Sequence, residues 1–285
     1  MVQFRQIVYL LSVSLLLFNT EISGTMSIDG YNVYYGDLHN HCNVDDGGHA
    51  KGTPAEAYSY ARTRGGMDFF GLASHDLYIT SEEWASIGTA ADAATIDGSF
   101  VGFRGFEWTT NPLGQIAIVN SNDYCTSAQT ATNTFSKICT WIDAREGCVA
   151  FLNHPGRQDA THEEFDHFNS TPASNVVGIE LWNKTDLFRS YYYNDGYYSN
   201  DNNKSYFDEA ISRGWRVGAG GGGDNHSGTW GTATNARIAI LANNLNRAEL
   251  LSALKARRFF STLDKNLALS FTIGGYQMGS TTSSA

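Results

Sequence analysis

Histidine and carboxylate side chains of this chain occur in pairs whose spacing suits metal coordination. His39 and His41 are one residue apart after an apolar run, and Asp224 and His226 repeat that spacing after a glycine-rich stretch. Residues i and i+2 of an extended segment project to the same side, so each pair can direct two ligand atoms toward one ion. One pair alone is a weak signal. Imidazole and carboxylate without thiolate suit zinc, manganese or iron.

Four further candidate ligands lie beside other apolar runs of the chain. They are Asp46, His75, Glu107 and His154. If these runs are strands of one α/β barrel, their carboxyl ends meet at one mouth, where such barrels build active sites. Clustered divalent ions there lower the pKa of a bridging water and yield hydroxide as the nucleophile. The pattern therefore predicts a metal-dependent hydrolase, with Glu107 and Asp224 taking part in catalysis.

Two cations near these clusters are candidates for holding an anionic substrate. Arg157 follows His154 by three residues, and Lys184 follows a predicted strand. Both groups bind phosphoryl oxygens through charge-assisted hydrogen bonds, so Arg157 is assigned a catalytic role, although ordinary surface charge explains both cations equally well. The Gly218–Gly223 run lacks the spacing and the lysine of a phosphate-binding loop, and we expect it to let the backbone pass close to the metals.

Apolar runs and helix-like segments alternate along the chain, which predicts an α/β fold with a mainly parallel sheet or a barrel. Helices are predicted over 54–64, 81–94, 134–145, 206–213 and 246–257. Strands are predicted over 34–38, 68–74, 100–106, 115–119, 149–152, 177–182, 216–219, 259–262 and 267–273. The polar segment 191–203 is predicted as a long loop that either borders the site or is simply solvated.

Composition and the N-terminus bound the class of protein. A net charge of -10 leaves few cations for a phosphate backbone, so nucleic acid is not an expected partner. Residues 1–24 combine a basic residue, a short apolar run and small residues, which predicts a signal peptide, a secreted or periplasmic protein and no stable membrane anchor. Export would permit a disulfide among Cys125, Cys139 and Cys148, but the sequence cannot choose the pair.

Six motifs in register resemble the PHP (polymerase and histidinol phosphatase) superfamily. They are Tyr35–His41, Asp46-Gly47, the strand ending in His75, Gly105–Glu107, Asn153–Pro155 and Asp224–His226. The resemblance implies a distorted, TIM-like (β/α)7 barrel over residues 25–278. The glycine, serine and threonine residues of 279–285 give that tail the composition of a linker. Phe259–Thr262 and Gly274–Gly279 are similar to the carbaryl-hydrolase-like branch, whose longer members continue into a β-rich domain.

The resemblance also implies two or three divalent ions, Zn, Mn or Fe, and assigns ligands to them. It places His39, His41, Glu107 and Asp224 on one ion. Glu107 would bridge from that ion to a second ion, which His154 would hold.

A third ion would be held by Asp46, His75 and His226. One position departs from the family pattern, because the histidine expected a few residues after Glu107 is replaced by Gln115. Glutamine is a poorer ligand than imidazole for these metals, so we expect the second ion to be weakly bound or missing.

Most characterised members of the superfamily are phosphoesterases, so the resemblance implies a phosphomonoesterase or phosphodiesterase that acts on a small anionic phosphoester. The branch similarity supports a second hypothesis, a carbamate, ester or amide hydrolase. A third hypothesis is a non-catalytic binding domain that has kept the fold. The sequence indicates neither the natural substrate nor the oligomeric state.

Overall fold

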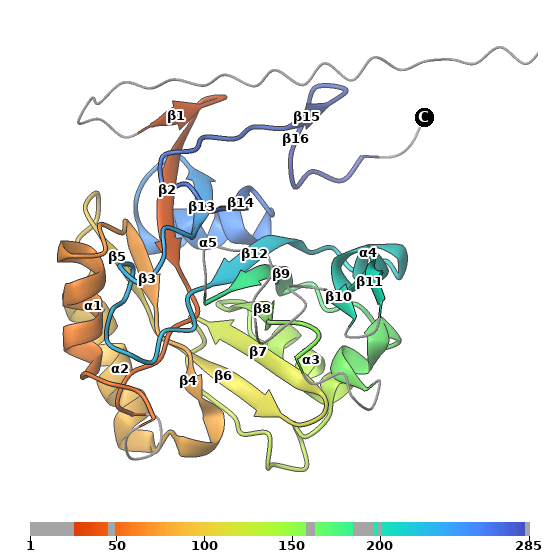
Figure 1. The fold of residues 1–285 in the computed structure, drawn as a ribbon, viewed down its shortest axis with the longest axis horizontal. Helices are drawn as coiled ribbons and strands as arrows, with labels where there is room; N and C mark the ends of the chain where they lie inside the picture. Colours follow the sequence, from red (N-terminus) through yellow and green to blue (C-terminus); the bar gives the residue numbers. More distant parts are fainter. Residues whose placement is uncertain (1–25, 45–48, 158–162, 185–196, 199–200, 283–285) are drawn as a thin grey trace, which may run out of the picture.

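The computed structural model describes residues 26–44, 49–157, 163–184, 197–198 and 201–282 (Figure 1). Helices and strands form a mixed α/β fold, which confirms the predicted class at that level. The helices are α1 (Pro54–Thr63), α2 (Ser81–Ala94), α3 (Phe135–Asp143), α4 (Tyr206–Ser212) and α5 (Arg247–Lys255). The strands are β1 (Ser27–Ile28), β2 (Tyr31–Asp37), β3 (Phe69–Gly71), β4 (Ser74–His75), β5 (Val101–Phe103), β6 (Gly105–Thr110), β7 (Gly114–Val119), β8 (Val149–Asn153), β9 (Val176–Asn183), β10 (Tyr197–Tyr198), β11 (Asp201–Ser205), β12 (Gly218–Gly222), β13 (Arg237–Ala242), β14 (Phe259–Thr262), β15 (Thr272–Ile273) and β16 (Tyr276–Gln277).

Two larger sheets carry most of the strands. The first has the order β14-β13-β2-β3-β5, with β1 paired to β2, and the second has the order β12-β9-β8-β7-β6-β4. β13 runs antiparallel to β2, and β7 runs antiparallel to both of its neighbours, so the sheets are mixed rather than mainly parallel. Among the described residues, the strand ladders do not close the two sheets into one barrel.

The two sheets enclose a shared apolar core. Its side chains come from both sheets, for example Phe69 of β3, Val119 of β7 and Phe151 of β8. β3 leads into β4 and β5 leads into β6 within a few residues, so the chain passes twice from the first sheet to the second. At the other junction, the Phe259 ring of β14 lies so close to Gly218 of β12 that an added Cβ atom would be 2.6 Å from it.

Alternation along β6 points one carboxylate into the molecule. Phe106 and Trp108 pack outward in the cluster that includes α3, so Glu107 between them faces inward. The expectation that Glu107 lies at a strand end is wrong, because β6 continues to Thr110 in an antiparallel hairpin with β7. The hairpin keeps the carboxylate in a regular, buried strand.

The five predicted helices are confirmed, and their ends differ from the predictions by at most two residues. Thr53 and Glu56 form a capping box at the start of α1, and Thr80 and Glu83 form another at α2. Each box pairs N–H groups that a helix start otherwise leaves without partners. α1 and α2 cover the outer face of β3 and β5, whereas α3 packs on the second sheet (Figure 1).

Several strand predictions need correction. The predicted strand 100–106 is divided at Arg104 into β5 and β6, and only Thr272–Ile273 of the predicted strand 267–273 is extended in a ladder. The predicted loop 191–203 contains β10 and most of β11, which pair as a hairpin. β13 has no predicted counterpart at all, although it joins β2 to β14 in the first sheet.

All four cysteines belong to the described part of the chain and are buried, and no disulfide joins Cys125, Cys139 and Cys148. Burial raises the pKa of Cys148 to about 11, which keeps this thiol protonated and unreactive at neutral pH. The predicted signal peptide, 1–24, lies outside the described residues. Within the described ranges, no helix combines the length and the apolar character that crossing a bilayer requires.

Candidate metal centre

The end of β2 and the glycine-rich segment at β12 join the two sheets at one edge. The His41 N–H donates to the carbonyl of Asn225, and the Asp224 N–H donates to the carbonyl of His39. A Cβ atom added at Gly222 would lie 2.7 Å from the Cβ atom of His39, which is closer than such atoms approach. Glycine is therefore needed for this close passage, as expected from the glycine run.

The carboxylate of Glu107 lies at the centre of the cluster. Its oxygens are 3.1 Å from Nε2 of His39, 3.2 Å from Nε2 of His75 and 3.4 Å from Nε2 of His154. Glu107 is 1% exposed, and its Oε2 accepts no hydrogen bond from the described residues. A buried carboxylate oxygen without a donor, surrounded by imidazole nitrogens, fits a metal ligand.

Asp224 forms a second point of convergence. Its Oδ1 lies 3.1 Å from Nε2 of His41, 3.4 Å from Nδ1 of His226 and 3.7 Å from Nε2 of His39. Its Oδ2 lies 3.1 Å from Nζ of Lys184. The two pairs recognised from their spacing, one of histidines and one of aspartate with histidine, thus meet in one place.

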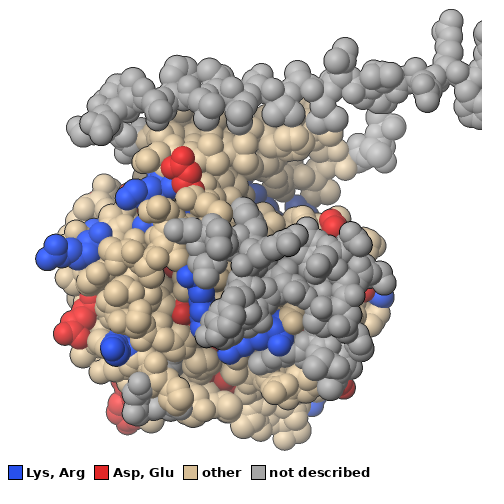
Figure 2. Space-filling model, in the orientation of Figure 1, with Lys and Arg blue, Asp and Glu red and all other residues tan. Residues whose placement is uncertain are grey.

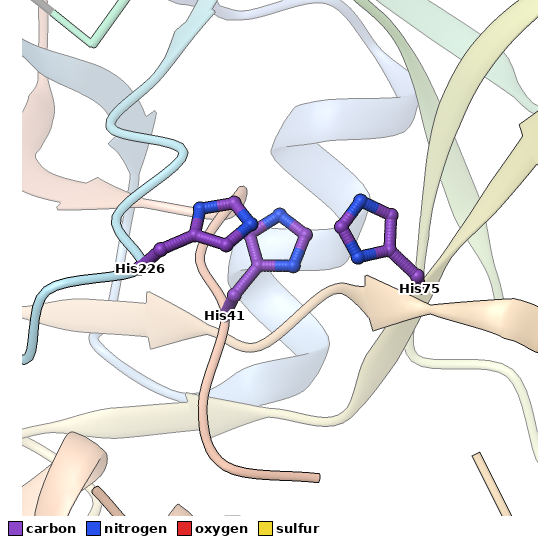
Figure 3. Close-up of side chains that lie close together, drawn as sticks. All are labelled: His41, His75 and His226. Atoms are coloured by element: carbon purple, nitrogen blue, oxygen red, sulfur yellow. The ribbon is translucent and has the colours of Figure 1, made fainter. Parts of the chain in front are cut away.

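His41, His75 and His226 bring three imidazole rings together from separate segments (Figure 3). The rings of His41 and His226 stack with their centroids 3.9 Å apart, and the His75 ring lies 4.5 Å from that of His41. One nitrogen from each ring lies within 4.8 Å of the other two, a spacing that suits a shared ion. Asp46, which was expected to join this group, lies outside the described residues.

The structure brings seven of the eight predicted metal ligands together. Two further groups of three satisfy the same distance, namely His39 with His41 and Glu107, and His39 with His154 and Asp224. His154 thus lies close to Glu107, which the resemblance placed on the same ion, and also to Asp224. The role of these side chains as metal ligands stays a prediction.

Glu180, in the middle of β9, holds two of these histidines. Its Oε1 lies 2.7 Å from Nδ1 of His39, and its Oε2 accepts hydrogen bonds from the backbone N–H of His154 and from Nδ2 of Asn183. A carboxylate on one ring nitrogen fixes the tautomer that leaves the other nitrogen able to bind a metal. Sequence reasoning assigned no role to Glu180, although a lone acid inside an apolar strand was a visible signal.

Asp37 supports the same segment from the end of β2. It accepts hydrogen bonds from the backbone N–H groups of His39, at 3.0 Å, and Gly223, at 2.9 Å. Burial raises the pKa of Asp37 to about 6, and these hydrogen bonds oppose the shift. This positioning role was not expected, because nothing in the sequence says which side chains accept backbone hydrogen bonds.

The pKa values of the cluster follow from burial and from neighbouring charges. Burial lowers the pKa of His39, but Glu180 and Glu107 outweigh burial and hold it well above its ordinary value. Burial raises the pKa values of Glu107 and Asp224, yet nearby histidines outweigh it and hold both carboxyls well below their usual range. Burial lowers the pKa of His226 to about 4, so its ring is neutral at pH 7. Neutral imidazole and ionised carboxylate are the forms that bind metals, so His226 and both carboxyls already have the required form, whereas His39 must lose a proton when an ion binds.

Three residues at this edge have backbone conformations in the left-handed region. The φ angles are 27° at His154, 43° at Asp224 and 66° at Lys184. Residues other than glycine rarely adopt such angles. Strain of this kind persists where the surrounding structure fixes it, and Phe165–Phe168 share it away from the cluster.

Gln115 lies at the start of β7, beside the cluster. Its Oε1 accepts a hydrogen bond from Nη1 of Arg157 at 3.1 Å, and the same Nη1 lies 3.4 Å from Nε2 of His154. Gln115 stands where the resemblance implied a histidine, and it holds the guanidinium group of Arg157 beside His154.

The remaining histidines lie outside the cluster or outside the described residues. His49 is exposed and belongs to none of the three groups. His167 has its Nδ1 3.3 Å from Oε2 of Glu209, which lies on α4. His162 lies outside the described residues.

These observations define the class: a mixed α/β protein in which histidines and carboxylates from several strands form a candidate metal centre. No family model matches the sequence, and no curated protein matches it. Solved structures with similar folds include two proteins. One is a two-domain protein from Bacteroides vulgatus ATCC 8482 that contains a predicted PHP-like metal-dependent phosphoesterase; it is 18% identical with a TM-score of 0.60, over 87% of this chain and 70% of that chain. The other is PsfC from Pseudomonas syringae PB-5123, which is 13% identical with a TM-score of 0.53, over 82% of this chain and 93% of that chain.

Proposed function

We propose that this protein is a metal-dependent phosphoesterase of the PHP superfamily. The observation that carries the proposal is the convergence of five histidines on two buried carboxylates, Glu107 and Asp224. The fold shared with the Bacteroides protein, which contains a predicted PHP-like metal-dependent phosphoesterase, supports the same assignment. The core shared by the two sheets and the hydrogen bonds between them support a distorted (β/α)7 barrel.

The proposed ligands of one ion are His39, His41, Glu107 and Asp224, and those of another are Asp46, His75 and His226. Zinc, manganese or iron is proposed because these metals accept imidazole and carboxylate together. Ions bound there would lower the pKa of a coordinated water and would neutralise charge on phosphoryl oxygens. The chain contributes the orientation of the ligands, since Glu180 and Asp37 fix the ring and the backbone of His39.

Two cations border the ligand cluster and suit an anionic substrate. Nζ of Lys184 lies beside Asp224, and the guanidinium of Arg157 lies beside His154. Figure 2 shows Lys and Arg side chains in the middle of the face that it presents. Local positive charge on a chain with a net charge of -10 favours a small phosphoester over a long polyanion. Charged donors fixed at such a site stabilise charge that develops during phosphoryl transfer.

The proposal is tested by measuring metal content and turnover on the same preparations. Protein reconstituted with Zn²⁺ or Mn²⁺ is assayed with p-nitrophenyl phosphate, bis(p-nitrophenyl) phosphate and an aryl carbamate, and we expect turnover of a phosphate ester that chelation abolishes. Glu107→Gln should remove both activity and bound metal, whereas His167→Ala, outside the cluster, serves as the matched control. A metal-loaded protein that turns over neither phosphate ester refutes the phosphoesterase assignment. Less than one ion per chain after reconstitution would favour a non-catalytic domain.

The aryl carbamate arm of this assay addresses the second substrate class. β14 and β16 fall on the residues that resemble the carbaryl-hydrolase-like branch. Turnover of the carbamate alone would move the protein to that branch.

We also propose that residues 1–24 direct secretion. Cleavage near residue 24 is then expected, and mass spectrometry of the exported protein tests it.

A further inference from the structure

The guanidinium of Arg157 lies where it competes with a metal ion for His154. Its Nη1 is 3.4 Å from Nε2 of His154, the nitrogen that also lies 3.4 Å from Oε1 of Glu107. In the tautomer that carries its proton on Nδ1, Nε2 has one lone pair, which either accepts an N–H or binds a metal. A guanidinium stays protonated in proteins, so Arg157 cannot lose its charge to make way for a metal ion at Nε2 of His154.

Gln115 holds the guanidinium in this place. Its side chain is 4% exposed at the start of β7, and by register it pairs with Asn153, the last residue of β8 before His154. Its Oε1 accepts from Nη1 of Arg157 at 3.1 Å. An amide oxygen is a good acceptor for a guanidinium and a poorer ligand than imidazole for zinc or iron, so Gln115 suits a fixed cation better than a metal ion.

We propose that Arg157, held by Gln115, replaces one divalent ion of the cluster at His154. The positive charge of Arg157 then compensates part of the negative charge of Glu107, on the side where the resemblance implied an ion. The proposal rests on the proposed function, because it concerns how many ions the remaining ligands bind. It predicts that the protein binds ions at the His41, His75 and His226 side and none on Nε2 of His154.

Metal stoichiometry of three forms tests the replacement. After reconstitution with Mn²⁺ and removal of excess metal, we expect the wild type and Gln115→His to contain the same number of ions. The double variant Gln115→His/Arg157→Ala should gain about one ion per chain, because a ligand is added and the competing cation is removed. Gln129→His, at an exposed position, controls for the addition of a histidine. A full extra ion in Gln115→His alone, or no gain in the double variant, overturns the proposal.

A second measurement uses the wild type and does not depend on the folding of variants. Anomalous scattering from Mn²⁺-loaded crystals should give peaks at His41, His75 and His226 and none at coordination distance from Nε2 of His154. A peak on Nε2 of His154 overturns the replacement and leaves the proposed function intact. Absence of every peak contradicts the proposed function instead, while the double variant still tests the exchange of Arg157 for an ion.

Discussion

Replacing Glu180 with glutamine tests how the site selects the ligating nitrogen of His39. Oε1 of Glu180 lies 2.7 Å from Nδ1 of His39, whereas Oε2 accepts two hydrogen bonds, one from the backbone of His154 and one from Asn183. Glutamine has only one acceptor oxygen. Two donors lie at the Oε2 position and one at Oε1, so we expect the amide oxygen to turn toward the pair and the NH₂ group toward His39.

The NH₂ group would then donate to Nδ1 of His39, so the ring proton would move to Nε2. Nε2 is the nitrogen that lies 3.1 Å from Glu107 in the cluster, and a protonated nitrogen cannot bind a metal. Loss of an orienting carboxylate of this kind costs about 10–100-fold in metal affinity. That range corresponds to about 1.4–2.7 kcal/mol at 298 K.

The assay is a titration with Zn²⁺ or Mn²⁺ against a chelator of known affinity, with circular dichroism to verify the fold. Glu146→Gln, at an exposed position, is the matched control and should bind metal as the wild type does. A folded Glu180→Gln variant whose metal affinity stays within about twofold of the wild type would refute the tautomer argument, since the expected loss is at least about tenfold.

Three further predictions follow from other residues. The pKa of Asp37, raised to about 6 by burial, exceeds its ordinary 3.8, so metal-free protein should lose up to about 3 kcal/mol of stability as pH rises from about 4 to about 6; urea unfolding should show that Asp37→Asn lacks this loss, and equal slopes would contradict it. Burial raises the pKa of Cys125 to about 12 and of Cys148 to about 11, so iodoacetamide at pH 8 should label native protein slowly and unfolded protein fully, as mass spectrometry can measure; rapid native labelling would argue against this packing. Lys184→Ala should raise KM for a phosphoester roughly tenfold while Lys137→Ala leaves it unchanged, and an unaltered KM would remove Lys184 from substrate binding.

The parts of the fold that are encoded locally could be predicted from the sequence. α2 has a threonine cap, an acidic first turn and a buried face, all of which lie within its own residues. The pairs at His39 and Asp224 were recognisable because the i and i+2 geometry of extended chain depends on neighbours only. Their meeting required the further assumption that strand ends share one edge, which the hydrogen bond between the Asp224 N–H and the His39 carbonyl satisfies.

The parts that depend on distant residues could not be predicted in the same way. β13 is buried at every position, so it lacks the alternation that identifies a half-buried strand. Of its two partners, β2 lies near the other end of the chain and β14 follows only after helix α5. Glu180 was visible as an acid within a strand, but its function depends on His39, 141 residues away. The replacement of a ligand by Gln115 was visible, whereas its pairing with Arg157 required the fold.

The balance of buried charge favours cations at this site independently of any resemblance. Glu107, Glu180, Asp37 and Asp224 are between 1% and 4% exposed. Ionised carboxylates removed from water destabilise a fold unless opposite charge or hydrogen bonds compensate, and apolar replacements of similar volume are often neutral or stabilising. A binding domain without metal would be more stable with such replacements, yet Oε2 of Glu107 accepts no hydrogen bond from the described residues. Divalent ions would supply the charge that this arrangement requires, so metal binding explains the cluster better than a site without metal.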